Sequence, residues 1–247
     1  MFNKLNSILK KHILLILVFG FLCSCDEDVK IEFSEEIIET LNNADISINF
    51  PKAEGKDDVS KLINNTIENY IVNQINFSED TLTHLSIKDA MQRFDNEFNS
   101  FKNDFPESPQ KWEAFIDGEV TYSSPEVISI AINSYLDTGG AHGNSNVKFF
   151  NFNPQTGKLY SKTQIISNID KLSNVIKNHL NQHMKSNSDE PMEDYFFGKD
   201  FQLPETLGYS DEGLIVLYNP YEIASYAQGI IQFTIPYEDV DSFLNIN

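Results

Sequence analysis

The sequence predicts an α+β fold, in which an antiparallel sheet carries helices on one face, built as a single compact domain or as two intimate subdomains. Apolar residues follow the helical period of about 3.6 residues over 57–105 and alternate with polar residues over 112–152. Helices and strands that are grouped in this way are typical of α+β rather than alternating α/β proteins. The turns between the predicted strands are short, and such turns join antiparallel neighbours.

The N-terminus resembles a secretory signal. Residues 1–12 carry lysines and no acid, and Ile13–Leu22 is an apolar stretch that is too short for a membrane span of about 20 residues. It ends in Leu22-Cys23-Ser24-Cys25, which resembles a bacterial lipobox with Cys25 as the lipidated residue; the alternative is a plain signal peptide. The chain is therefore divided into a lipoprotein signal peptide (1–24), a lipidated cysteine with an acidic linker (25–28) and one extracytoplasmic domain (29–247).

This division predicts a membrane-anchored lipoprotein of the bacterial cell envelope, either periplasmic or exposed at the surface. The acidic run Asp26-Glu27-Asp28 is similar to surface-export signals in some Gram-negative groups, whereas an Asp at this place is similar to inner-membrane retention signals in others. Both cysteines of the chain lie in this region, so the predicted domain has no disulfide framework and no cysteine metal site.

The first half of the domain contains two predicted strands followed by two predicted helices. Alternating apolar residues predict strands at 31–33 and 46–50. Asp57 is placed to cap a helix with an apolar stripe. Ser86 can cap a second helix, whose phenylalanine stripe packs in the core and which ends before Pro106.

The rest of the domain is predicted to be mainly strands, interrupted by one long helix. The predicted elements, in order, are strands at 112–120, 128–132 and 150–152, a turn into 158–160, a helix around 172–180, a loop with a helical turn at 186–200, strands at 214–218 and 231–235, and a short closing helix at 240–244. There is no internal repeat and no linker long enough to separate two domains.

The composition excludes several classes of function. With 37 Asp and Glu against 18 Lys and Arg, the formal net charge is −19, which argues against binding to nucleic acid or anionic lipid and permits a basic partner. Phosphate-loop, serine-hydrolase and zinc-protease motifs are absent. His179 and His183 could present two imidazoles to a metal, but no third ligand is evident, so a half-exposed helix flank is the favoured interpretation. We expect no catalytic residue, no metal and no cofactor.

Two loops are the candidate binding sites. The first contains Gly139, Gly140 and His142, in a stretch where three glycines in five residues allow close backbone approach. The second, Asn219–Gly229, is rich in aromatic residues, and loop tyrosines suit recognition. Its candidate binding residues are Tyr221, Glu222, Ser225 and Tyr226, with Tyr226 as the favoured anchor. The alternative interpretation is that both loops are purely structural.

These motifs together resemble one extracytoplasmic domain family. The Thr-Gly-Gly-Ala-His-Gly loop, the Asn-Pro-Gln-Thr-Gly-Lys turn and the Tyr-Glu-Ile-Ala-Ser-Tyr-Ala-Gln-Gly loop before Ile-Pro-Tyr are similar to the domain of RsiV-type anti-sigma factors, which bind lysozyme. They are also similar to the N-terminal domain of PdaC-type peptidoglycan deacetylases. The resemblance covers about residues 29–245 and implies a lysozyme contact through the second loop. Ser225 departs from the family, which usually has Pro there.

The surroundings of the domain differ from both relatives. RsiV-type proteins carry a sigma-binding segment and a membrane span before it, and in the deacetylases a catalytic domain follows it. Because only the signal and Cys25 precede the domain and the sequence stops at Asn247, we expect neither sigma-factor release nor deacetylation. We expect a lipid-anchored, non-enzymatic protein that binds lysozyme or another cationic protein. The alternatives are a peptidoglycan- or glycan-binding module, and an envelope enzyme or scaffold using the His142 loop.

Overall fold

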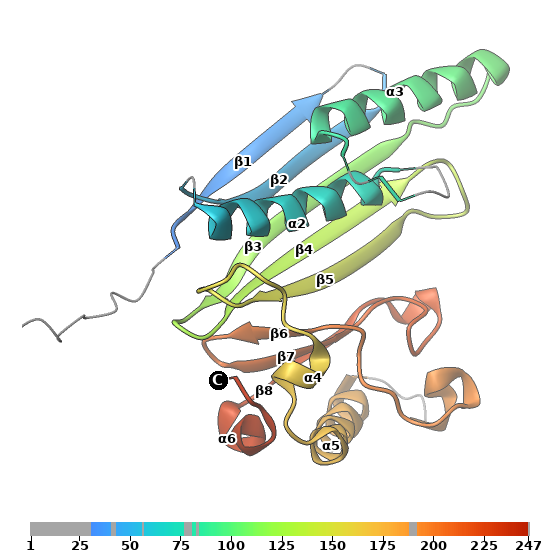
Figure 1. Ribbon diagram of the computed structural model, residues 1–247. Coiled ribbons are helices and arrows are strands. Elements are labelled where there is room, and N and C mark those ends of the chain that lie inside the picture. Colours follow the sequence, from blue (N-terminus) through green and yellow to red (C-terminus); the bar gives the residue numbers. More distant parts are fainter. Residues whose placement is uncertain are drawn as a thin grey trace, which may run out of the picture.

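The structure, a computed structural model, describes residues 31–246 apart from 41–42, 56, 77–80, 83 and 188–191. The predicted signal peptide, Cys25 and the acidic linker lie outside the described residues. The described residues form a five-stranded sheet and a three-stranded sheet, each with helices on one side (Figure 1). The α+β fold class predicted from the sequence is therefore confirmed.

The first sheet is formed by the first half of the chain and has the strand order β1-β2-β3-β4-β5. Its strands are β1 (Phe33–Thr40), β2 (Asp45–Ala53), β3 (Glu113–Ser123), β4 (Ile128–Asp137) and β5 (Asn144–Phe152). All neighbours are antiparallel except β2 and β3, which run parallel. The expected antiparallel sheet thus contains one parallel pair, because the chain passes through two helices between β2 and β3 and returns in the same direction.

Those two helices, α2 (Asp58–Gln74) and α3 (Ile87–Asp104), cover one face of the first sheet (Figure 1). Both predicted N-caps are confirmed, because the side chains of Asp57 and Ser86 each accept a hydrogen bond from a backbone N–H of the first turn, at 2.7 and 3.1 Å. The predicted phenylalanine stripe of α3 is confirmed as core for Phe94 and Phe98, with Phe101 partly buried, but its last member, Phe105, follows the helix and is exposed.

The second sheet and its helices are formed by the second half of the chain. Their bounds are α4 (Lys162–Ile165), α5 (Ile169–Asn187), β6 (Leu207–Ser210), β7 (Gly213–Tyr218), β8 (Ile231–Ile235) and α6 (Tyr237–Val240), with 3-10 turns at Met192–Gly198, Tyr226–Gln228 and Asp241–Phe243. The order is β6-β7-β8, all antiparallel. The strand β6 was not predicted, because its four residues are almost all buried and show no alternation.

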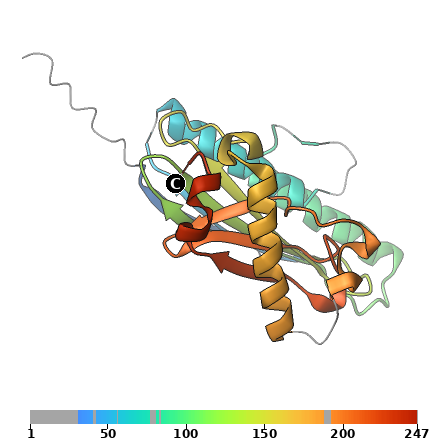
Figure 2. The same cartoon turned by 90° about the horizontal axis from the view of Figure 1, so that it is seen from below.

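The alternation of β7 determines how the layers stack. Leu214 and Val216 belong to a core that is shared with α5 and α6, whereas Ile215 and Leu217 point the other way and pack on Phe149 of β5. The second sheet therefore lies between α5 and the first sheet, where β6 contacts β3, β4 and β5, and Figure 2 shows α5 crossing it. In the part of the chain that is described, no helix has the length and hydrophobicity of a membrane span.

Candidate functional site

The two loops singled out from the sequence lie side by side in the structure. The first joins β4 to β5, and the second joins β7 to β8. The hydroxyl of Tyr221 lies 3.3 Å from Nε2 of His142, although the two residues are 79 positions apart. The hydroxyl of Tyr226 donates a hydrogen bond of 2.9 Å to the carbonyl oxygen of Gly143. Three of the predicted site residues, His142, Tyr221 and Tyr226, thus form one group, termed the aromatic cluster.

The rings of the aromatic cluster pack against one another. The His142 and Tyr226 rings are stacked, with centroids 3.6 Å apart and planes inclined by 16°. The Tyr221 ring lies 5.9 Å from that of Tyr226 and 6.5 Å from that of His142. Tyr221 is the outermost, since 56% of it is exposed, whereas Tyr226 is partly buried. Such packing presents a broad apolar surface with polar edges and little freedom to move.

The hydrogen bonds of His142 define its tautomer. Its Nδ1 lies 2.8 Å from the carbonyl oxygen of Gly143, which can only accept, so Nδ1 carries the proton. In the neutral ring Nε2 is then the acceptor, and it receives the hydroxyl of Tyr221. The two ring nitrogens of His142 are therefore hydrogen-bonded to Gly143 and to Tyr221. The same Gly143 oxygen also accepts from Tyr226, which fixes the two loops to each other.

The backbone of Tyr221 has a conformation that is uncommon for a residue with a side chain. Its φ is +68°, in the left-handed region. The turn around it is closed by hydrogen bonds from the N–H of Tyr221 to the oxygen of Ala224 and from the N–H of Glu222 to the oxygen of Asn219, both 3.0 Å. Strained residues of this kind are concentrated at binding and active sites. The turn holds the exposed Tyr221 ring beside His142.

Glu222 and Asn219 fix the second loop to the first sheet. The carboxylate of Glu222 accepts hydrogen bonds from the backbone N–H groups of Asn219, at 2.9 Å, and of Glu205, at 2.6 Å. Burial raises the pKa of Glu222, and these hydrogen bonds only partly oppose the rise. The side chain of Asn219 pairs with both backbone groups of Val147 on β5, at 2.8 and 2.9 Å. Glu222, a predicted binding residue, therefore positions the loop.

Asn219, Gly143 and Tyr135 belong to the site and lie in the two stretches singled out from the sequence, but they were not among the candidate binding residues. Gly143 could have been found, because it closes the glycine-rich loop. Nothing local to Asn219 signals that it pairs with Val147, 72 positions away. Tyr135 reads only as a strand residue, yet its ring fills the space in which a side chain at Gly143 would lie.

The remaining predicted residues lie beside the aromatic cluster. Gly139 has a φ of +83°, and its carbonyl oxygen accepts a hydrogen bond from the side chain of Gln110. Gly140 faces open space. Ser225 is exposed, begins the 3-10 turn that carries Tyr226, and donates to the side chain of Gln228. Its φ of −68° is close to the value that a proline ring imposes.

Two family models match successive parts of the chain. The model described as deacetylase PdaC matches residues 37–145, and the model described as a protein of unknown function (DUF3298) matches residues 162–238. A segment similar to PdaC is thus followed by a segment similar to DUF3298, and these are termed the PdaC-like and the DUF3298 segments. The resemblance to PdaC-type domains predicted from the sequence is thereby confirmed. His142 lies in the PdaC-like segment and Tyr221 and Tyr226 in the DUF3298 segment, so the aromatic cluster forms where the two segments meet.

Solved structures share the fold. A DUF3298 family member from Bacteroides fragilis is 18% identical, with a TM-score of 0.64, and the match covers 87% of this chain and 93% of that one. A DUF3298 family protein from Pseudomonas aeruginosa is 16% identical, with a TM-score of 0.61 and the same coverage. No curated protein sequence matches the chain.

Gly143 gives a direct test of how the first loop packs against β4. A Cβ at this position would overlap the ring of Tyr135, so we expect Gly143→Ala to displace that ring and to lower the free energy of unfolding by about 1–3 kcal/mol. Gly140→Ala is the matched control, because the nearest atom would be 3.9 Å away. Urea denaturation of both variants measures the difference, and equal stability of the two would contradict the described contact.

The histidine pair of α5 is not arranged as a metal site. His179 Nε2 lies 3.4 Å from a carboxylate oxygen of Asp239, and the ring of His183 packs 5.6 Å from that of Phe233. Within residues 31–246 as described, no group of three or more His, Cys, Asp or Glu side chains could hold a metal ion. The two imidazoles serve contacts between α5 and the second sheet and its C-terminal helix.

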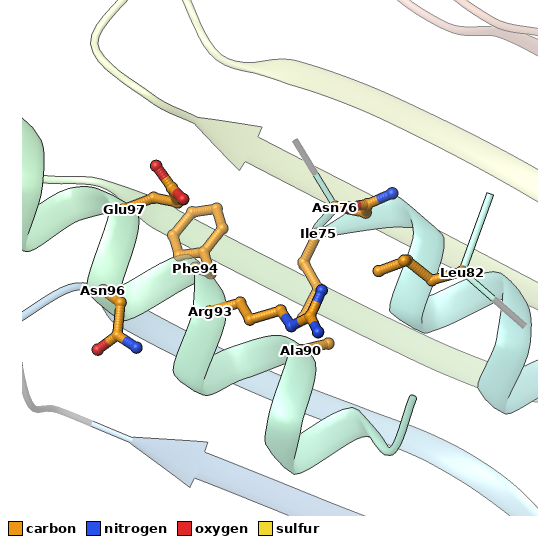
Figure 3. Close-up of a pocket in the computed structure, with 8 residues that line it drawn as sticks. All are labelled: Ile75, Asn76, Leu82, Ala90, Arg93, Phe94, Asn96 and Glu97. Carbon is orange, nitrogen blue, oxygen red and sulfur yellow. The ribbon is translucent and has the colours of Figure 1, made fainter. Parts of the chain in front are cut away.

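A cavity of about 320 Å³ lies between the end of α2 and α3 in the PdaC-like segment. Figure 3 shows the guanidinium of Arg93 reaching toward Ile75 and Leu82. The residues that line the cavity are Ile75, Asn76, Leu82, Ala90, Arg93, Phe94, Asn96 and Glu97. None of the candidate binding residues lines it.

Proposed function

We propose that this chain is a lipid-anchored, non-enzymatic binding protein of the bacterial cell envelope, and that its aromatic cluster binds a basic protein, with lysozyme as the candidate partner. One observation carries the proposal: two loops from different segments of the chain build a single exposed group of stacked rings. Rigid, exposed tyrosines surrounded by other contacts are common hot spots of protein interfaces.

The hydrogen bonds of the His142 ring support binding rather than catalysis. A general base needs a ring nitrogen that can reach the proton of a substrate. In His142, Nδ1 donates to Gly143 and Nε2 accepts from Tyr221, so both nitrogens serve the shape of the cluster. The imidazole therefore acts here as a flat ring that supports Tyr221 and Tyr226.

The charge of the chain supports a basic partner. A formal charge of −19 attracts a cationic protein over long distances and raises its rate of association, with a strong dependence on salt. Lysozyme is the candidate because the loop Tyr221–Gly229 resembles that of RsiV-type proteins, which bind it. The matches to the PdaC and DUF3298 models also support a location in the cell envelope, because the chain resembles these families.

Tyr221, rather than Tyr226, is the proposed anchor. Tyr226 is partly buried and holds Gly143, whereas Tyr221 is exposed and held in a strained turn. We expect Tyr221→Ala to weaken lysozyme binding by about 2 kcal/mol, or about 30-fold, with little change in the melting temperature. Surface plasmon resonance on the immobilised full chain measures the affinity.

The matched control for Tyr221→Ala is Phe105→Ala. Phe105 is an aromatic residue of similar exposure, at 58%, at the end of α3. We expect this change to leave lysozyme affinity within about twofold of wild type, because isolated exposed residues outside an interface contribute little. Equal weakening by both changes would contradict the proposed anchor. Retention of the chain by purified peptidoglycan but not by lysozyme would favour the glycan-binding alternative.

The lipid anchor is tested at Cys25. Lipid attachment proceeds through the cysteine sulfur, so we expect Cys25→Ser to abolish incorporation of labelled fatty acid and to leave an unprocessed precursor. Cys23→Ser is the matched control and should be labelled like wild type. Equal labelling of the Cys25→Ser variant would exclude the lipobox.

A further inference from the structure

We infer that the part of the first sheet's outer face that the second sheet leaves uncovered, over β1, β2, the first part of β3 and the end of β4, is a second contact area for the same basic partner and is continuous with the aromatic cluster. This inference rests on the proposed function and names the charged part of the binding surface. The area, termed the open face, is defined by outward-pointing carboxylates of these strands: Glu35, Glu39, Glu113, Asp117, Glu119 and Asp137.

Strand alternation separates the open face from the core. Ile116 of β3 is buried under α2 and α3, so its neighbours Phe115 and Asp117 point to the opposite side of the sheet, where both are exposed. The second sheet covers that side near β4, β5 and the end of β3, through contacts such as Phe149 with Ile215 and Tyr122 with Tyr209. Over most of β1 and of the part of β3 that ends at Glu119, the residues that point to this side are exposed in the described structure.

The charge of the open face is mainly negative, and at its edge Lys111 pairs with Asp45 of β2, with Nζ and a carboxylate oxygen 3.4 Å apart. Among the described residues of β1 to β4, no Lys or Arg occupies a strand position on this side. Glu113 and Asp137 are directly opposite each other on neighbouring antiparallel strands, a like-charge pairing that destabilises a sheet. No metal-binding group is formed by these or any other described side chains. A lysine or arginine from a partner would relieve this repulsion.

Apolar side chains are interspersed with these carboxylates. Phe115 and Tyr135 are cross-strand neighbours whose rings stack at 6.2 Å with planes inclined by 10°. Phe115 is 37% exposed, and Ile37 of β1 is 59% exposed. Protein–protein contact areas commonly have aromatic and aliphatic residues at the centre and polar or charged residues at the rim. A uniformly solvated sheet face would carry polar residues at these positions.

Tyr135 links the open face to the aromatic cluster. Its ring lies against Gly143, whose carbonyl oxygen accepts hydrogen bonds from both His142 and Tyr226. The exposed rings therefore continue from Phe115 on β3, through Tyr135 on β4, to Tyr221 on the second loop. One partner that contacts Tyr221 can lie over the open face without a gap.

Charge complementarity selects the class of partner. A second copy of this chain, docked face to face, would oppose Glu113 and Asp117 with the same carboxylates. Nucleic acid and anionic lipid would be repelled in the same way. A basic protein gains both from long-range attraction and from pairing its cations with these carboxylates.

Two variants, each with three carboxylates replaced by the amides of the same size, test the inference with lysozyme as the probe. The open-face variant combines Glu35→Gln, Asp117→Asn and Glu119→Gln. The control variant combines Glu97→Gln, Asp104→Asn and Glu107→Gln, which are exposed residues of α3 and the turn after it. Both change the net charge equally, so a difference between them reports on position. Since all six side chains are exposed and the replacements are isosteric, we expect unchanged melting temperatures.

We expect the open-face variant to associate with lysozyme about tenfold more slowly than wild type at low salt. Its association rate should also lose most of its dependence on salt. The association rate of the control variant should stay within about twofold of wild type. Phe115→Ala should speed dissociation about tenfold. If Tyr221→Ala weakens binding while the open-face variant and Phe115→Ala behave like the control, the inference is wrong and the proposed function stands. If the wild-type chain fails to bind lysozyme even at low salt, both are wrong.

Discussion

Replacing Phe98 with Ala is expected to lower the free energy of unfolding by about 3–5 kcal/mol. Phe98 is only 5% exposed, and its ring lies 5.6 Å from that of Trp112, where α3 packs beside the start of β3. Truncation removes buried apolar surface and leaves a cavity, and a loss of this size approaches the whole stability of an ordinary domain. Denaturation of the wild type and the variant in urea measures it.

Phe105→Ala is the control on the same helix face. Because Phe105 is 58% exposed, we expect a change within about 0.5 kcal/mol. Ile130→Ala tests the facing strand: Ile130 is fully buried on β4, and its truncation should cost about 2–5 kcal/mol. Unchanged stability of both core variants would mean that α3 does not pack on the first sheet as described.

Asp95→Ala is the second change with a large expected effect, a loss of about 3 kcal/mol. Asp95 is 3% exposed on α3, and its carboxylate accepts hydrogen bonds from the backbone N–H of Ala44, at 2.9 Å, and from the N–H and side chain of Asn43, at 3.0 and 2.8 Å. Truncation leaves the buried N–H of Ala44 without a partner and breaks both bonds to the exposed Asn43. The carboxylate therefore ties α3 to the start of β2.

The contribution of Asp95 also predicts a dependence on pH. Burial alone would raise the pKa of Asp95, but the hydrogen bonds from Ala44 and Asn43 outweigh it and hold the pKa below its usual value. Since the folded pKa is lower than the unfolded one, the stabilisation is complete above the unfolded value of about 3.9 and is lost as the pH falls through the folded value. The difference in stability between wild type and Asp95→Ala should shrink from pH 6 to pH 2. A constant difference would contradict this assignment.

Features that depend on neighbouring residues were predictable from the sequence. The caps Asp57 and Ser86 and the buried stripe of α3 follow from local hydrogen bonding and helical periodicity. The parallel pairing of β2 with β3 was not predictable, because it depends on where two helices return the chain. The short strand β6 is defined by burial against Phe149 rather than by its own pattern.

At the candidate site, too, local features were predictable from the sequence and long-range packing was not. Glycine and tyrosine content singled out both loops, but their meeting depends on how the two sheets pack. Sequence reasoning favoured Tyr226 as the anchor, and only the structure shows that Tyr226 is occupied with Gly143 while Tyr221 is exposed. The open face could not be recognised either, because its carboxylates come from strands whose order in the sheet is a long-range property.

The pairing of Asn219 with Val147 has a consequence for solubility. The strand β5 is the last of its sheet, and an edge strand of this kind offers free N–H and C=O groups to any other extended chain. At Val147 the amide of Asn219 satisfies both groups, much as a further strand would, and Thr206 accepts the N–H of Phe149 nearby. The second half of the chain thus protects the β5 edge from pairing with other molecules, which matters for a protein whose expected position on a membrane would crowd many copies together.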